Sequence, residues 1–533
     1  MNKLKKDSKS TEVLIVGAGI AGLVCALELL KSGKQVTVID AQDRNKIGGL
    51  ARLAFGGMAL IDTPEQRSKG VKDSPELAYK DWCSFAEFGE NDEWPKAWAK
   101  YYVENSITEV YEYIRKLGVK FLPAVNWVER GLYTPGNSLP RYHILWGASL
   151  YLVEKIVEVL SHYEGKTLTY EFNTKVENLI HSKGQVSGCI GINDANEKTE
   201  FLADKVVIAC GGFTGNLDMV REFWPKAWGK APQNLLNGSH PSNDGHLHQC
   251  VETMGGAVTH KSDMWNYAAG VPNPKAEFEN QGLSLIPSKS ALWVDHQGKR
   301  IGPEPLVTGF DTNHMCQQIS QLQLPHTWQI LNRRIALKEF AISGCEHNPS
   351  IRDKKFLSLL NEILLGNKKL VNRMINESDH FIVANDLPTL VEKMNQLTPE
   401  HSMDYQQLSD SLNSLDNQLK MKPKFWNDDQ IRRILQTRNW LTDKLRTCYP
   451  KPIQGDLPLI AIKLNIITRK SLGGIQTDMQ CRALNKAGQA IEGLYAIGEA
   501  AGFGGGGASG KRSLEGTFLS GCILTARQAA RSI

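Results

Sequence analysis

The clearest structural pattern in the chain is VLIVGAGIAGLVCALELLKSGKQVTVID, residues 13–40. It places Gly17, Gly19 and Gly22 in G-x-G-x-x-G spacing, between a short β-branched run and an apolar run of helix-forming residues. A second β-branched run, QVTVI, follows and leads directly to Asp40. Because the fingerprint, its flanking elements and the acid occur together, the pattern predicts a strand–turn–helix–strand unit that binds a dinucleotide.

Each part of this unit has a physical task. Gly17 permits a tight turn, Gly19 lets the backbone approach a pyrophosphate, and Gly22 lets the helix and the strand pack closely. The amino end of the helix stabilises the phosphate charge, and Asp40 can accept hydrogen bonds from ribose hydroxyls. The other residues of this unit that we expect to contact the nucleotide are Ile20, Ala21 and Ala41.

The bulk composition excludes several classes of protein. Of the net charge of +5 over 533 residues, +3 belongs to the opening MNKLKKDSKS, so we expect a disordered basic tail at residues 1–10 and no nucleic-acid partner. Residues 13–30 resemble a signal anchor, but a glycine turn splits them and no small-residue cleavage site follows, so we expect no integral membrane segment. The ten cysteines form no CxxC pair, which favours a cytoplasmic protein with reduced thiols.

The dinucleotide is expected to be FAD, because the elements that would complete the sheet lie far apart in the chain. KVVIACGG, residues 205–212, and GLYAIGEAAG, residues 493–502, each have the pattern of a strand that runs into a small-residue turn. IGGLARLAFGGM, residues 47–58, carries two glycine pairs where backbone could lie against a flat ring. GFGGGG at 502–507 has no second strand with a terminal acid after it, so we expect it to be a flexible or substrate-adjacent loop and no second nucleotide site.

The order of these patterns predicts an α/β fold with a Rossmann-like FAD-binding domain that is discontinuous in sequence. The strand-and-glycine character of residues 11–270 returns at 456–533, whereas residues 271–455 carry Pro-punctuated loops and long polar helices. We expect residues 271–455 to be an inserted α+β cap that binds substrate. Residues 64–163 are expected to be a largely helical insertion in the FAD-binding domain.

Longer motifs are more specific than the glycine fingerprint, and they are DTPEQRSKGVKDS (62–74), NSLPRYHILWG (137–147), EFAISGCEHNP (339–349), LNIITRKSLGGIQTD (464–478) and GFGGGGASGKRSLEGTFLSGC (502–522). Through them the chain resembles, over nearly its whole length, the flavoprotein superfamily of fumarate reductase, succinate dehydrogenase and ketosteroid dehydrogenase. It is most similar to a bacterial group of FAD-binding dehydrogenases. The resemblance implies that residues 271–455 close over the flavin as a mobile cap.

The resemblance also implies several cofactor contacts. The glycine pairs at 48–49 and 56–57 match the segment along the isoalloxazine ring. Val176 matches a backbone contact to adenine, and Glu499 matches the acid that meets the ribityl chain. The contacts expected beyond the fingerprint are Gly48, Gly49, Leu50, Ala51, Gly56, Gly57, Val176, Ala209, Gly211, Gly212, Asp244, Gly498, Glu499, Gly516 and Thr517.

The FAD is expected to be noncovalent. Members of the superfamily that attach FAD covalently place a His shortly before the second glycine pair, and Leu50 stands at that position here. We therefore expect acid or heat to release intact FAD into the supernatant of the purified, denatured protein. The measurement is the flavin absorbance of pellet and supernatant after centrifugation, and flavin that stays in the pellet would contradict the prediction.

The cationic residues expected at the reacting face lie near the carboxyl end. Flavin-dependent dehydrogenation needs a hydride transfer, a proton transfer at the adjacent carbon, and a group that polarises the activating carbonyl or carboxylate. Arg512 matches the arginine that holds a substrate carboxylate in fumarate reductases, although it could instead pair with Glu515 or with a loop carbonyl. Arg469 and Lys470 stand where fumarate reductases have paired histidines, which argues against fumarate itself, and they could instead belong to an exposed turn.

Aromatic residues beside glycine turns are candidates for the proton relay. Tyr142 in PRYHILWG and Tyr267 in DMWNYAAGV could line a pocket and move protons, although core packing is the alternative for each. His246 and His248 are two positions apart and would point to different faces of a helix, so we expect no metal site.

These expectations define an FAD-dependent dehydrogenase or ene-reductase. It would act on a CH–CH bond beside a carbonyl or carboxylate of a small molecule, either ketosteroid-like or dicarboxylate-like, with an external electron acceptor or donor. The alternatives are a flavin oxidase of the same Rossmann type and a redox-inert FAD-binding subunit of a larger complex. The length of the cap and the GGIQTD segment argue against the oxidase.

Overall fold

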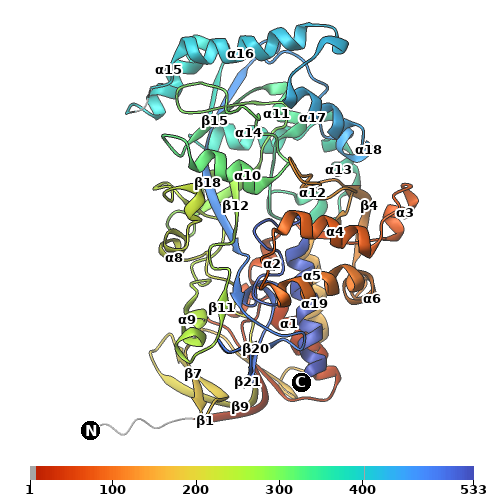
Figure 1. Cartoon of the computed structure of the whole chain (residues 1–533), viewed down its shortest axis with the longest axis vertical. Coiled ribbons are helices and arrows are strands. Elements are labelled where there is room, and N and C mark those ends of the chain that lie inside the picture. Colours follow the sequence, from red (N-terminus) through yellow and green to blue (C-terminus); the bar gives the residue numbers. More distant parts are fainter. Residues whose placement is uncertain (1–7, 401) are drawn as a thin grey trace.

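Residues 13–40 form the predicted strand–turn–helix–strand unit in the computed structural model, which describes residues 8–400 and 402–533 (Figure 1). Strand β1 (Ser8–Val16) leads into α1 (Ile20–Lys31), and β2 (Val36–Ile39) then pairs in parallel with β1. The apolar run at 13–30 is therefore divided between a strand and a helix, as the glycine fingerprint predicts. Within the described ranges, no helix is both long and apolar enough to cross a membrane.

The first sheet joins segments from both ends of the chain. Its eight strands follow the order β20-β21-β8-β9-β1-β2-β6, with β7 paired to β8. Leu494 of β21 pairs in parallel with Val206 of β9, so residues near the carboxyl end complete a sheet that begins with β1. This pairing agrees with the prediction of a discontinuous Rossmann-like domain. The remaining strands are β6 (Leu168–Glu171), β7 (Thr174–Ser182), β8 (Gln185–Asn193), β9 (Lys198–Ile208), β20 (Arg482–Leu484) and β21 (Ala490–Ala496).

Helices from distant segments cover this sheet. The last helix, α19 (Thr517–Ser532), packs on α1, which also contacts α7 (Ala148–Leu160) (Figure 1). α1 is apolar nearly all round and is buried along most of its length, because it lies between the sheet and these two helices.

The beginning of the chain differs from the prediction. Residues 8–10 belong to β1 and pair in parallel with residues 200–202 of β9, so the predicted disordered tail is wrong for them. Their backbone groups extend a ladder that continues the buried part of the strand, and this pairing outweighs their polar composition. Residues 1–7, the rest of the predicted tail, lie outside the described residues.

The insertion at 64–163 is less helical than predicted. It contains α4 (Pro75–Ala86), α5 (Glu93–Asn105) and α7, but also β4 (Lys120–Asn126) and β5 (Tyr142–Trp146). β5 pairs with β4 and with β3 (Gly57–Ala59) to form a three-stranded sheet. The motif YHILW alternates between half-buried and buried positions, which is the period of a strand.

A second sheet builds the cap, with β14-β15-β18-β12-β13-β16 as its order and with β10 and β17 also paired to β18. The long strand β18 (Leu459–Ser471) and strand β12 (Met264–Pro272) belong to this sheet. The predicted boundaries at 270 and 456 instead assign β18 and most of β12 to the FAD-binding domain. Both strands run from the cap sheet toward the first sheet (Figure 1). The other strands are β10 (Leu236–Asn237), β13 (Gly282–Ile286), β14 (Leu292–Val294), β15 (Thr327–Asn332), β16 (Ala341–Ile342) and β17 (Phe381–Ala384).

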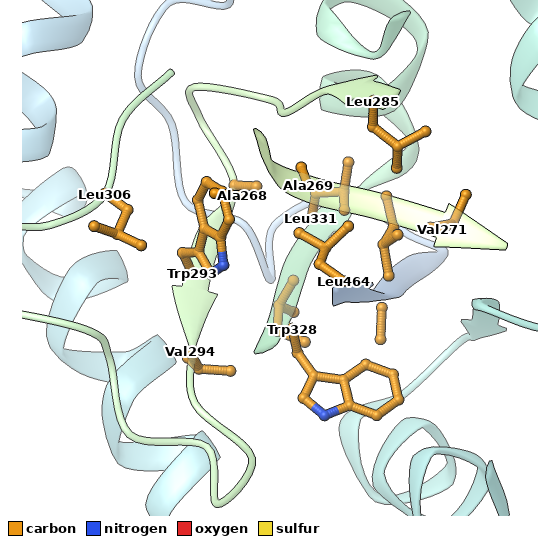
Figure 2. Close-up of a cluster of buried hydrophobic side chains, with 14 of the residues drawn as sticks. Ala268, Ala269, Val271, Leu285, Trp293, Val294, Leu306, Trp328, Leu331 and Leu464 are labelled. Atoms are coloured by element: carbon orange, nitrogen blue, oxygen red, sulfur yellow. The ribbon is translucent and has the colours of Figure 1, made fainter. Parts of the chain in front are cut away.

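The cap has its own apolar core. Trp293, Trp328 and Leu331, which belong to strands of its sheet, pack in one buried cluster with Leu285 and Leu464 (Figure 2). The indole nitrogen of Trp293 donates to the Thr327 hydroxyl at 2.8 Å, so its one polar atom is satisfied inside the core. The helices that surround this core include α10 (Thr312–Ser320), α14 (Lys368–Glu377), α15 (Leu387–Leu397), α16 (Tyr405–Lys420) and α17 (Asp429–Arg438).

Candidate active site

A cavity of about 1100 Å³ lies where the carboxyl ends of β1, β2 and β9 meet the cap. Ligands of open α/β sheets bind at this edge of the sheet. Gly22, Gly498 and Thr517 do not line the cavity. The predicted cofactor contacts that do are Gly17, Gly19, Ile20, Ala21, Asp40, Ala41, Gly48, Gly49, Leu50, Ala51, Gly56, Gly57, Val176, Ala209, Gly211, Gly212, Asp244, Glu499 and Gly516.

The fingerprint glycines provide room for a pyrophosphate. A Cβ atom on Gly22 would lie 1.9 Å from the Gly17 carbonyl oxygen, so this position permits the close approach of helix and turn. A Cβ atom on Gly19 would meet no protein atom within 4 Å, and Gly19 faces the cavity. No side chain caps the amino end of α1, so its backbone N–H groups are available to an anion there.

Asp40 holds the fingerprint loop and retains acceptor capacity. Its Oδ2 accepts a hydrogen bond of 2.6 Å from the Ala18 N–H, and its Oδ1 accepts one of 2.8 Å from the Gln42 N–H. Burial raises the pKa of the Asp40 carboxyl, and these two N–H donors oppose that rise. A carboxylate offers about four lone-pair sites, so ribose hydroxyls can bind the remaining two. The glycine cradle, the free helix end and this acid together fit the ADP half of FAD.

Glu499 lies deeper in the cavity and is held from two sides. Its Oε1 accepts a hydrogen bond from the Ser471 N–H at 3.0 Å, and its Oε2 pairs with Lys470 Nζ at 3.5 Å. A Cβ atom on Gly212 would lie 2.5 Å from Glu499 Oε1, so glycine is needed for this packing. Lys470, a predicted catalytic residue, is therefore committed to an ion pair at the end of β18.

The reacting end of the cavity contains a tyrosine, a glutamate and an arginine. The Tyr267 hydroxyl donates to Glu515 Oε2 at 2.7 Å. The Arg469 guanidinium carbon lies 5.4 Å from the centre of the Tyr267 ring, and the Trp265 ring contacts that ring edge-on. β12 carries the tyrosine, β18 the arginine, and the loop before α19 the glutamate, so three distant segments meet here.

Tyr142 connects this group to the predicted flavin segment. A Cβ atom on Gly57 would overlap the Tyr142 hydroxyl, and one on Gly516 would lie 3.0 Å from the Tyr142 ring. The ring therefore packs between the second glycine pair and the turn that follows Glu515. The glycine pairs are the segment expected along the isoalloxazine ring, so this group lies at the end of the cavity where the flavin ring is expected.

Burial raises the pKa of Glu515, Tyr267 and Tyr142. Desolvation raises the pKa of Glu515 above its ordinary value, and Tyr267 and Arg469 partly oppose the rise. Desolvation, with a contribution from the Glu515 charge, also raises the pKa of Tyr267 and of Tyr142. At neutral pH both tyrosines are therefore neutral phenols, whereas Glu515 is a stronger base than an exposed glutamate.

The structure does not support the assignment of Arg512 to the substrate side of the flavin. Arg512 does not line the cavity. Its Nε pairs with Asp311 Oδ1 at 3.1 Å, and its Nη1 pairs with Glu87 Oε1. Asp311 precedes helix α10 of the cap, and Glu87 follows helix α4, so Arg512 joins the cap to the FAD-binding domain. These partners differ from Glu515 and the loop carbonyl, which were the expected alternatives.

Replacing Arg512 by Ala is therefore expected to lower stability and leave the flavin in place. Asp311 is nearly buried and would lose its cation, which costs about 1–3 kcal/mol of unfolding free energy. The measurements are thermal unfolding and flavin content. Lys511→Ala is the matched control, because Lys511 pairs with Glu87 at the surface and its loss costs at most about 1 kcal/mol. Loss of FAD without loss of stability would contradict this account of Arg512.

The loop at residues 502–507 is buried rather than flexible. Phe503 lines the cavity, whereas the glycines after it pack against Trp94, Trp98 and His260. The loop forms turns with neither the strand nor the helix that a second nucleotide site needs. Phe503 is thus the residue of this loop that is positioned to lie beside a substrate.

The fold and the cavity define an FAD-binding oxidoreductase, and comparisons with known proteins agree. Residues 12–519 match the family model described as FAD binding domain. A KsdD-like steroid dehydrogenase of Mycobacterium tuberculosis (strain CDC 1551 / Oshkosh) is 38% identical over 98% of this chain and 96% of its own length. A fumarate reductase (cytochrome) of Shewanella frigidimarina is 26% identical over 55% of this chain and 47% of its own length.

A solved structure shares the fold over nearly the whole chain. The 3-ketosteroid Δ1-dehydrogenase of Sterolibacterium denitrificans superposes with a TM-score of 0.72 at 16% identity, covering 98% of this chain and 99% of that one. The chain therefore belongs to the FAD-binding flavoprotein family that contains the KsdD-like steroid dehydrogenases and the fumarate reductases. It is an FAD-dependent oxidoreductase, which confirms the cofactor and the enzyme class expected from the sequence.

Proposed function

We propose that the chain dehydrogenates a flat, apolar cyclic ketone of the 3-ketosteroid class. The hydrogen bond from Tyr267 to Glu515, close to Arg469 at the flavin end of the cavity, carries this proposal. The relatives that are 38% identical over nearly their full length are named as steroid dehydrogenases, which supports the substrate class.

The lining of this end of the cavity favours an apolar substrate over a dicarboxylate. Several aromatic and aliphatic side chains lie close to Tyr267, whereas a dicarboxylate needs two cationic partners. Of the three predicted catalytic cations, Lys470 is paired with Glu499 and Arg512 with Asp311, whereas no ion pair is found for Arg469 among the described residues. The apolar and aromatic side chains at this end are Tyr142, Trp265, Tyr267, Phe503, Phe518 and Leu519.

The residues of the chain supply the proton chemistry. A bound FAD would supply the two-electron oxidant here, as the acceptor for the hydride from one substrate carbon. Tyr267 Oη takes the proton from the carbon beside the carbonyl while its own proton moves to Glu515 Oε2, and a carbon–carbon double bond forms. The raised basicity of Glu515 favours this transfer, and Arg469 stabilises the negative charge that develops on the relay.

Electrons are proposed to leave the flavin to an external acceptor, because the described residues contain one nucleotide unit with its full strand and helix context.

A cytoplasmic location is also proposed. The ten cysteines are all free thiols in the structure, which suits a reducing compartment.

An anaerobic half-reaction tests the substrate class. We expect the absorbance of oxidised flavin to fall within seconds to minutes after a saturated 3-ketosteroid is added, with the unsaturated steroid as the product. Succinate at the same concentration should leave the spectrum unchanged. Flavin reduction by succinate and not by any 3-ketosteroid would overturn the proposal, and its failure with both would favour the redox-inert alternative.

A further inference from the structure

Helix α13 (Phe356–Leu365) of the cap exposes an unusual amount of apolar surface. Its sequence, FLSLLNEILL, contains a single charge, and of its apolar side chains only Leu359 is buried in the cap. Soluble proteins rarely expose a contiguous patch of this kind unless it contacts another surface. We define the α13 face as the large side chains that keep between 42% and 80% of their surface exposed, Phe356, Leu357, Leu360, Leu364 and Leu365.

Basic residues border the α13 face at both ends. Lys354 and Lys355 precede the helix, and Lys368 and Lys369 follow it. The segment 349–369 contains five basic and two acidic residues, a net charge of +3. Lys355 pairs with Asp353, but no ion pair is found for Lys368 or Lys369 anywhere in the described parts of the chain. An apolar helical face flanked by lysines is typical of a helix that lies in a membrane interface.

The α13 face lies beside the wall of the substrate cavity. Helix α13 packs on α12 (Pro349–Arg352) and is followed along the chain by α14, three residues of which line the cavity. The segment before α12 also lines it through His347 and neighbouring residues, and Cys345 of this segment bonds to the backbone of Leu53, a cavity residue that is 54% exposed. Figure 1 shows α12 and α13 on the flank of the cap where it adjoins α2 (Gly49–Leu53) and the FAD-binding domain.

We propose that the α13 face docks the enzyme peripherally on an anionic lipid surface. A helix of ten residues is about 15 Å long, half of the hydrocarbon thickness of a bilayer, so it lies on the membrane and does not span it. A second copy of the chain is the other obvious occupant. Two α13 faces packed antiparallel would bring the lysines of one end against those of the other, which is repulsive, whereas anionic headgroups attract both ends.

Docking would place the cavity next to the phase in which an apolar substrate dissolves. Only this role in the supply of an apolar substrate rests on the proposed function. The docking itself depends on lipid alone, so its test needs no substrate and its failure is separable from a failure of the proposed reaction.

Flotation of the FAD-loaded enzyme with vesicles is the test. Vesicles of phosphatidylcholine with an equal part of phosphatidylglycerol should carry the wild type to the top of the gradient, and added salt should weaken binding. Leu357→Ser/Leu364→Ser should lower the partition coefficient at least tenfold per leucine. Lys368→Gln/Lys369→Gln should lower it about fivefold per lysine on these vesicles and leave partition into pure phosphatidylcholine unchanged.

Met421→Ser/Phe425→Ser is the matched control. These two side chains, 46% and 58% exposed, lie elsewhere on the cap, and their loss should leave flotation unchanged. Equal flavin content and melting temperature show that each variant is folded. A wild type that stays at the bottom with excess lipid, or a leucine variant that floats like the wild type, would overturn the proposal. So would a concentration-dependent dimer of the wild type that the leucine variant abolishes, because the α13 face would then be a contact between copies.

Discussion

Replacing Tyr267 by Phe is expected to slow substrate-driven flavin reduction by roughly 10²- to 10⁴-fold, the usual range for losing a general acid–base group. The variant keeps the aromatic ring that packs against Trp265 and removes only the hydroxyl that bonds to Glu515. FAD content should not change, because the cofactor contacts of the fingerprint are untouched. The measurement is the anaerobic rate at which oxidised-flavin absorbance disappears after mixing with substrate.

Two further variants make this result interpretable. Tyr113→Phe removes the hydroxyl of another buried tyrosine, one that does not line the cavity, and should leave the rate unchanged. Tyr142→Phe shows which of the two tyrosines moves the proton, because Tyr142 also lies at the flavin end but packs against Gly57 and Gly516. If Tyr267→Phe reduces its flavin at the wild-type rate while Tyr142→Phe does not, the proton step belongs to Tyr142 and the relay through Glu515 is wrong.

Replacing Gly19 by Val is expected to abolish FAD binding without unfolding the protein. The backbone of Gly19 is extended, with a φ of −70°, so a β-branched residue fits there. Its Cβ would meet no protein atom within 4 Å, and the branched side chain would fill the space that the pyrophosphate needs. The purified variant should therefore be colourless, with a circular-dichroism spectrum like that of the apo wild type.

Gly22→Val provides the contrast for this prediction. Its Cβ would collide with the Gly17 carbonyl at 1.9 Å, so it should disrupt the packing of α1 and reduce the yield of folded protein. A Gly19→Val protein that retains a full complement of flavin would show that the cavity beside Gly19 does not hold the pyrophosphate.

Local sequence signals predicted the nucleotide half of the molecule because its chemistry is local. The strand, the turn, the helix and Asp40 follow one another within residues 13–40, and each has a residue pattern with a physical cause. The return of strand and glycine patterns near residue 493 indicated the discontinuous domain, and the parallel pairing of β21 with β9 agrees with it.

The reacting group could not be predicted in the same way, because its contacts are not local. Tyr267 and Glu515 are 248 positions apart, and β12 and the loop before α19 bring them together. The sequence predicts Glu515 only as a possible partner for Arg512, and its position directly before the Gly516 turn is the one local signal for a site residue. The partners of Arg512 are similarly remote, since Asp311 and Glu87 come from the cap and from the helical insertion.

The predicted cap boundaries at 270 and 456 differ from the limits of the cap sheet for a related reason. The boundary at 270 falls inside β12, and the boundary at 456 falls just before β18, although both strands belong to the cap sheet. A boundary drawn where the composition changes therefore falls inside or beside a strand that both regions use.

The pH dependence of flavin reduction reports on the proton relay from Tyr267 to Glu515. Glu515 must be ionised to accept the proton, and burial raises its pKa above the ordinary value for a glutamate. The reduction rate of the wild type should therefore rise with pH through an apparent pKa above that value and then level off. Glu515→Gln cannot ionise, so it should be slow and lack this rise. A Glu515→Gln enzyme with the same rise and the same plateau as the wild type would contradict the relay.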